Sequence, residues 1–90
     1  MSNKGVIMFK NKTTNGQNNV CGKQLYRFRR SMLPKMSQQT FAKQCQLLGL
    51  DIDKNAVQRI ECGKRYVTDF ELLYFCKILN VSVEELLSEK

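Results

Sequence analysis

The stretch from Ser37 to Gly63 constrains the fold most, because it holds the start and stop signals of two short helices. Ser37 is a typical N-cap residue, since its hydroxyl can accept the free amide hydrogens of the turn that follows. Gly49 suits the left-handed conformation that ends many helices. Asp53 and Gly63 repeat this pair of signals. The stretch therefore predicts one helix that begins at Gln38 and ends at Gly49, and a second that runs from Asp53 to Gly63.

Apolar side chains recur at helical spacing in both predicted helices. Phe41, Cys45 and Leu48 stand at i, i+4 and i+7, and in the second helix Val57 and Ile60 face the same way. Hydrophobic pairs that can staple the two helix starts are Met36 with Phe41, and Ile52 with Val57. Each helix should therefore bury one face in a shared core.

The other face of the second predicted helix carries Lys54, Asn55, Gln58 and Arg59, with no carboxylate after the cap. These side chain types match the edges of bases, because Arg or Lys pairs with guanine and Asn or Gln pairs with adenine. We therefore take these four residues as candidate readers of DNA bases.

The pattern resembles the helix-turn-helix domain of the Cro/repressor (XRE-like) DNA-binding family from about Gly22 to Leu87. The matching residues are Ser37, Gln38, Phe41 and Ala42, then Val57, Arg59, Ile60, Glu61 and Gly63, and finally the run from Asn80 to Leu87. Between Ala42 and Val57 the chain is about five residues longer than the common form of the family. Roles are therefore carried over by counting backwards from Arg59, Ile60 and Glu61.

This resemblance implies a compact, all-α, lambda-repressor-like domain of five helices at 21–90, preceded by a flexible basic arm at 1–20. It implies a transcriptional regulator, most often a repressor in a bacterial or phage setting. Such a protein binds double-stranded DNA as a homodimer and places the Lys54 to Arg59 helix in the major groove. The alternative for the arm is terminal disorder without a role.

Three residues are expected at DNA phosphates: Gln38, Lys64 and Arg65. The two cations also suit a helix C-terminus through the helix dipole, and both roles can hold at once. The resemblance further pairs Arg29 with Glu61, which would tie the first helix to the end of the recognition helix. In the alternative, Arg29 or Arg30 faces solvent.

Charge is divided unevenly along the chain. Residues 1–66 carry thirteen Lys and Arg against three acids, a net of +10, whereas residues 67–90 carry two against five, a net of −3, which together give +7. A basic pole with an acidic surface behind it is typical of a phosphate-binding domain. Ordinary surface charge is the alternative explanation.

Three more helices are expected. The first runs from about Gly22 to Leu33, with Leu25, Phe28 and Met32 inward, and Pro34 stops it. Capping boxes at Thr68 with Glu71 and at Ser82 with Glu85 begin the fourth and the fifth, which ends near Ser88. The fourth should bury Leu72, Phe75, Cys76 and Leu79, and the acids of the fifth should point away from DNA. Tyr74 and Leu87 are candidates for a dimer contact, and the alternative is that either belongs to the core or is stray surface.

Composition disfavours other classes of protein. There is no histidine, and the four cysteines lie too far apart for a zinc site, so no metal and no cofactor are expected. We expect Cys45 and Cys76 in the core, and Cys21 and Cys62 as surface thiols of a reducing compartment. No apolar run could cross a membrane and no signal peptide is visible, so a cytoplasmic protein is expected.

Two competing functions remain open. An enzyme is disfavoured, because the chain has neither a Gly-rich phosphate loop nor paired carboxylates at a plausible site. A protein-interaction module that retains the fold without reading DNA is the stronger alternative. Such a module should carry apolar or acidic residues at the four positions of the outward face.

Overall fold

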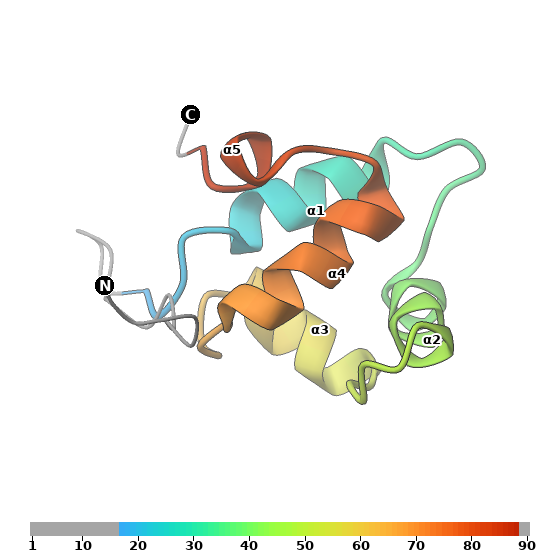
Figure 1. Ribbon diagram of the computed structural model, residues 1–90, viewed down its shortest axis with the longest axis horizontal. Coiled ribbons are helices and arrows are strands. Elements are labelled where there is room, and N and C mark those ends of the chain that lie inside the picture. The colour runs from blue at the N-terminus through green and yellow to red at the C-terminus, as the bar shows by residue number, and fades with distance from the viewer. Residues whose placement is uncertain (1–16, 89–90) are drawn as a thin grey trace.

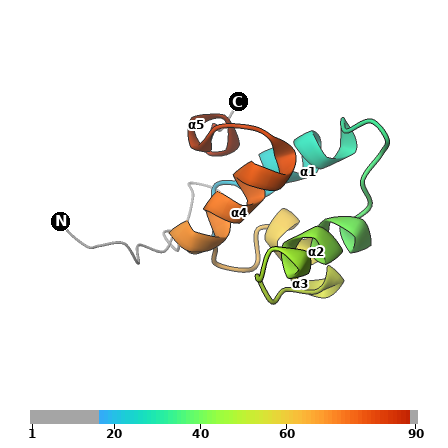
Figure 2. The same cartoon turned by 45° about the vertical axis from the view of Figure 1, so that its right-hand side comes forward.

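A computed structural model describes residues 17–88 and contains five α-helices. They are α1 (Gly22–Arg30), α2 (Gln38–Leu47), α3 (Lys54–Glu61), α4 (Asp69–Leu79) and α5 (Val83–Leu86). α4 packs against α1, α2 and α5, and α5 also lies against α1, at the far end from α2 and α3 (Figures 1 and 2). The prediction of an all-α, five-helix domain is confirmed. Most of the predicted arm, residues 1–16, lies outside the described residues.

Four helices begin where the sequence predicts, because their N-cap side chains each accept a hydrogen bond from a backbone amide three residues on. The pairs are Ser37 with Thr40, Asp53 with Ala56, Thr68 with Glu71, and Ser82 with Glu85. In the last two the glutamate also returns a hydrogen bond to the backbone of its cap, so both capping boxes are present.

Two glycines end α2 and α3 in the left-handed conformation, as predicted. Gly49 has φ of 100° and Gly63 has φ of 79°. The first and last helices end earlier than expected. Ser31 N donates to the carbonyls of both Arg27 and Phe28, but Met32 N forms only the tighter bond to Arg29 O, so Met32 packs against the core from outside the helix. α5 ends at Leu86, two residues before Ser88.

All five helices contribute buried residues to one core. The rings of Phe41 and Phe75 pack with their centroids 5.5 Å apart at an interplanar angle of 51°. All four apolar residues predicted to be inward on α4 are buried, as are Val57 and Ile60 on α3. The prediction for Leu48 is wrong, since its side chain is 41% exposed. α2 ends at Leu47, and Leu50 packs against the core instead.

The cysteines divide differently from the prediction. Cys45 and Cys76 are buried and Cys62 is exposed, as expected. Cys21, expected at the surface, is buried at 1% exposure because it directly precedes α1 and faces the core cluster. Burial raises the pKa of both the Cys21 and the Cys45 thiols to about 12. These thiols therefore stay protonated and unreactive at neutral pH.

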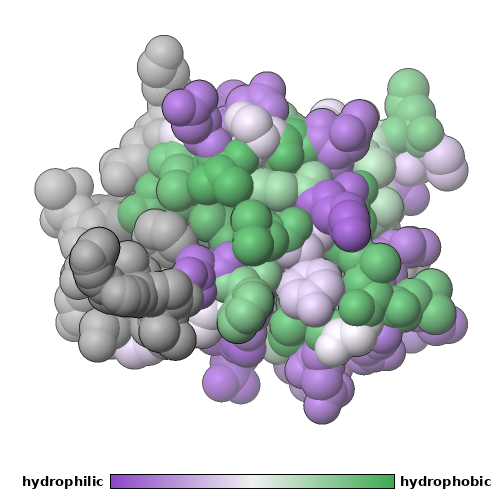
Figure 3. Space-filling model, in the orientation of Figure 1, coloured by the Kyte–Doolittle hydropathy of each residue, from purple (hydrophilic) through white to green (hydrophobic). Residues whose placement is uncertain are grey.

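The largest exposed apolar residues on α4 are not the two candidates for a dimer contact. Tyr74 and Leu87 are half-buried and pack against the core, which agrees with the alternative given for them, and their role in a dimer stays a prediction. On the outer side of α4 the large exposed residues are Phe70 and Leu73, at 68% and 57% exposure. Hydrophobic side chains gather on this face of the molecule (Figure 3). Phe70 and Leu73 belong neither to the capping box nor to the buried side of α4, so neither feature explains why these two positions are apolar.

Candidate nucleic-acid interface

The outward face of α3 has the composition and exposure that the sequence predicts. Lys54, Asn55, Gln58 and Arg59 are all exposed, whereas Val57 and Ile60 on the opposite side are fully buried. The buried residues fix the rotation of the helix about its own axis. Four polar side chains without a carboxylate are therefore presented to solvent from a fixed helix face.

The predicted ion pair between Arg29 and Glu61 is present. Arg29 Nε lies 2.7 Å from Glu61 Oε2, and Arg29 Nη2 lies 3.0 Å from Glu61 Oε1. The third guanidinium nitrogen, Nη1, donates to the carbonyl of Met36 at 2.9 Å. This arginine therefore joins α1 both to the end of α3 and to the segment that leads into α2.

Gln38, expected at a DNA phosphate, is already engaged inside the domain. Its Nε2 donates to Glu61 Oε1 at 2.9 Å, the same oxygen that accepts from Arg29. The side chain is half-buried between the start of α2 and the end of α3. The structure thus gives Gln38 a role in positioning α3, and its contact with phosphate stays a prediction.

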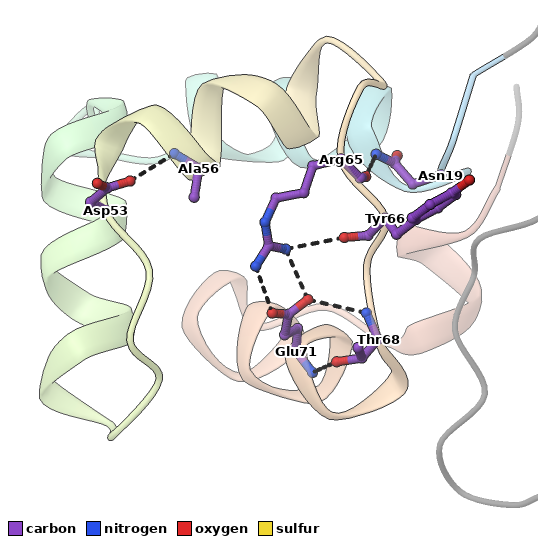
Figure 4. A network of polar contacts seen from close by, with 7 residues as sticks. All are labelled: Asn19, Asp53, Ala56, Arg65, Tyr66, Thr68 and Glu71. Carbon is purple, nitrogen blue, oxygen red and sulfur yellow. Dashed lines mark hydrogen bonds and ion pairs between the residues drawn. The ribbon is translucent and has the colours of Figure 1, made fainter.

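Arg65, also expected at a DNA phosphate, forms an ion pair within the domain. Its Nη2 and Nη1 lie 2.9 and 3.0 Å from the two carboxylate oxygens of Glu71, and Nη1 also donates to the carbonyl of Tyr66 (Figure 4). Two parallel hydrogen bonds of this kind fix both direction and distance. The neighbouring Lys64 is exposed. The geometry therefore makes Arg65 a residue that positions the loop after α3, with Lys64 as the cation open to an anion.

Glu71 takes part in both a helix cap and an ion pair. It closes the capping box of α4 with Thr68 and pairs with Arg65 (Figure 4). Burial by itself would raise the pKa of this carboxyl, but hydrogen bonds from Arg65 and Thr68, with the nearby positive charge, outweigh it and hold the pKa below its usual value. Glu71 therefore stays ionised at neutral pH and holds the loop and α4 together.

Sequence reasoning missed Asn19, which is 1% exposed. Its Nδ2 donates to the carbonyls of Ile60 at 3.0 Å and Arg65 at 2.8 Å, and its Oδ1 accepts from the Gly22 amide at 2.7 Å. One side chain thus caps the start of α1 and satisfies carbonyls at the end of α3. An Asn three residues before a helix start is the signal that could have indicated the first of these bonds.

Asn18 forms two hydrogen bonds to the loop that follows α3. Its backbone amide donates to the Gly63 carbonyl at 2.8 Å and its Nδ2 donates to the Lys64 carbonyl at 3.1 Å. Residues 17–20 were assigned to the flexible arm, yet these bonds and those of Asn19 fasten them to the end of α3. Asn18 and Asn19 therefore belong to the folded domain, although they precede residue 21.

A surface hollow extends the α3 face toward α2. It has a volume of about 290 Å³ and is lined by Gln39, Ala42, Lys43, Gln46, Asp53 and Lys54. Its two lysines come from different helices, and Lys54 belongs to both the hollow and the outward face of α3. Gln39 and Lys43 were not singled out from the sequence, because they stand outside the matched motif.

Residues 17–88 contain neither a cluster of metal ligands nor a membrane-spanning helix. No group of three or more potential metal-ligating side chains lies close enough together to hold an ion. None of the helices described is long and apolar enough to cross a membrane. Comparison of the chain with protein-family models, curated proteins and solved structures gives no match in any of the three.

Proposed function

We propose that this chain is a sequence-specific, double-stranded DNA-binding transcriptional regulator of the helix-turn-helix type, acting as a repressor in the cytoplasm. The observation that carries the proposal is the outward face of α3, where Lys54, Asn55, Gln58 and Arg59 are exposed together on a helix held from behind. A face of this chemistry fits the major groove, which admits an α-helix and presents hydrogen-bonding groups that distinguish all base pairs.

Each side chain has a separate task in this proposal. Arg59 and Lys54 donate to guanine, and Asn55 and Gln58 form paired hydrogen bonds with adenine. Lys64, exposed just beyond the end of α3, contacts a phosphate and sets the register without reading sequence. The ion pair of Arg29 with Glu61 keeps the angle of α3 relative to α1, so that all four side chains reach the groove together.

The DNA site should be symmetric and bound by two copies, because one short helix spans only a few base pairs. Half-sites should then lie about 10 base pairs apart, or a multiple of that, so that both recognition helices meet the same side of the duplex. The competing function is a protein-interaction module. The four exposed polar residues of α3 favour DNA over that alternative, since they are neither apolar nor acidic.

Selection of bound duplexes from a random library tests the proposal directly, because it reports the sequence, spacing and symmetry of the site together. We expect a palindromic consensus that the wild type binds far more tightly than a scrambled duplex. A variant with Ala at all four outward positions of α3 should lose this preference. The control is Glu84→Ala, at an exposed site on α5 that belongs to neither α3 nor α4, and it should bind as the wild type does. Enrichment of no sequence, with no binding to any duplex, would support the interaction module instead.

A further inference from the structure

The outer side of α4 carries an apolar surface that the proposed function does not use. Phe70 and Leu73 are 68% and 57% exposed, and with Tyr74 and Lys77 they line a shallow hollow of about 270 Å³. Figure 3 shows hydrophobic side chains gathered on this face. Single exposed apolar residues are ordinary, but a group that lines one hollow indicates a contact surface. We refer to Phe70, Leu73, Tyr74 and Lys77 as the α4 surface.

Charges flank this surface symmetrically about Leu73. Asp69 stands four residues before it and Lys77 four residues after it. Residues four apart are neighbours on one side of a helix, so the acid, the leucine and the lysine follow one another along α4. Eight residues of helix span about 12 Å, which keeps Asp69 and Lys77 of one copy from pairing with each other. Asp69 is half-buried and its Oδ1 accepts a hydrogen bond from the Phe70 amide at 2.8 Å, so it would meet a partner through its other oxygen, while Lys77 is exposed.

We propose that the α4 surface is a homodimer interface in which the α4 helices of two copies pack antiparallel about a two-fold axis through Leu73. A two-fold contact must be self-complementary, with residue i against residue j and j against i. The α4 surface meets this requirement. Leu73 meets Leu73 of the second copy, and each Asp69 meets Lys77 of the other copy, which gives two ion pairs. The inference stands independently of DNA binding, because it uses no residue of α3.

The size of the surface sets the strength of this dimer. An aromatic side chain such as Phe70 buries at most roughly 150 to 250 Å². A standard stable interface buries roughly 800 Å² per partner. Phe70 and Leu73, with the exposed edge of Tyr74, therefore fall well short of a permanent contact. The free protein should exchange between monomer and dimer, with a dissociation constant in the micromolar to millimolar range.

Sedimentation equilibrium of the full chain without DNA tests the charge pairing. Asp69→Lys and Lys77→Asp each place like charges opposite one another, so each should raise the dissociation constant of the dimer by at least ~10-fold. The double variant restores opposite charges and should recover the wild-type constant. Both exchanges oppose the dipole of α4, so recovery in the double variant cannot come from a more stable helix. Thermal unfolding of all three variants checks that they fold.

Cross-linking tests the position of the axis. In a Cys62→Ser background, Leu73→Cys should join two copies through a short bismaleimide, while the three buried cysteines stay unreactive. Leu47→Cys, at a 76% exposed site on α2, is the matched control and should cross-link weakly. A protein that stays monomeric up to ~1 mM, charge variants with no effect, or equal cross-linking at both sites would overturn the proposal and assign the α4 surface to a different partner.

Discussion

Arg29 and Glu61 face each other through two parallel hydrogen bonds, with side chains only 7% and 5% exposed. The same carboxylate also accepts from Gln38 at the start of α2. One buried anion thus fixes the relative positions of α1, α2 and α3. The exposed face of α3 owes its orientation to this contact as much as to the packing of Val57 and Ile60.

Glu61→Ala should strongly destabilise the fold, because it leaves the Arg29 guanidinium buried without its counter-charge. Breaking a buried pair from one side costs roughly 3 to 5 kcal/mol. In a domain of this size the melting temperature should fall by more than ~10 °C. Glu84→Ala, at an exposed site on α5, is the control and should change it little. An unchanged melting temperature for Glu61→Ala would show that the pair contributes no net stability.

Asn19→Ala should destabilise the domain more than Asn18→Ala does. The first change removes three hydrogen bonds at a fully buried site and leaves the Ile60 carbonyl without its side chain donor. Each buried group left unsatisfied costs about 1 to 3 kcal/mol. The second change removes the side chain bond to Lys64 at an exposed site and keeps the backbone bond to Gly63. Urea unfolding measures both, and equal losses would contradict the central role given to Asn19.

The helix starts could be predicted from the sequence because each depends on a cap and an amide three residues apart. Ser37, Asp53, Thr68 and Ser82 all cap as expected. Asn19 could not be placed in this way, since its partners Ile60 and Arg65 lie 41 and 46 residues further along the chain. Contacts of that range depend on how the helices pack, which no local pattern encodes.

The candidate site could be predicted only in part, because local patterns place the residues of one helix but not their distant partners. The periodicity of α3 placed its outward residues correctly, and the family resemblance supplied the pair of Arg29 with Glu61 across 32 residues. The pair of Arg65 with Glu71 was not predicted, because composition reveals charge but not its partner, and a contact of Arg65 with phosphate stays a prediction. Glu71 had been assigned only to its capping box, yet a carboxylate has two oxygens and can serve a guanidinium as well.

Acid should weaken the fold partly through Glu71. Its pKa is lower in the folded chain than the usual 4.5, so its contribution to stability is present above that value and is lost as the pH falls through the folded pKa. Glu71→Gln should therefore be less stable than the wild type at neutral pH, and the difference should shrink below pH 4.5. Thermal unfolding across this pH range measures the difference. Glu84→Gln is the control, and a difference that stays constant with pH would contradict the assignment.

Arg59 and Lys64 should affect DNA binding in different ways. If Arg59 reads a base edge, Arg59→Ala costs ~1 to 3 kcal/mol on the selected site and relaxes preference at one position, with little loss on scrambled DNA. If Lys64 contacts only phosphate, Lys64→Ala weakens both duplexes equally and lowers the salt-dependence slope by roughly one. Arg65→Ala distinguishes a structural role from a phosphate contact. If Arg65 stabilises the loop through its pair with Glu71, this variant should lose thermal stability in the absence of DNA.

Titration of these variants against selected and scrambled duplexes at several salt concentrations distinguishes the roles. The connection between α2 and α3 is longer than in the common form of the resembled family, and such a connection can tilt α3 so that its N-terminal residues enter the groove most deeply. In that case Lys54→Ala or Asn55→Ala relaxes the preference in place of Arg59→Ala, and Lys43 and Gln39 beside them become the nearest phosphate contacts. Equal losses on both duplexes for Arg59→Ala would remove it from the set of base readers. Binding by the wild type that ignores sequence would leave α3 as a basic surface for DNA without a reading function.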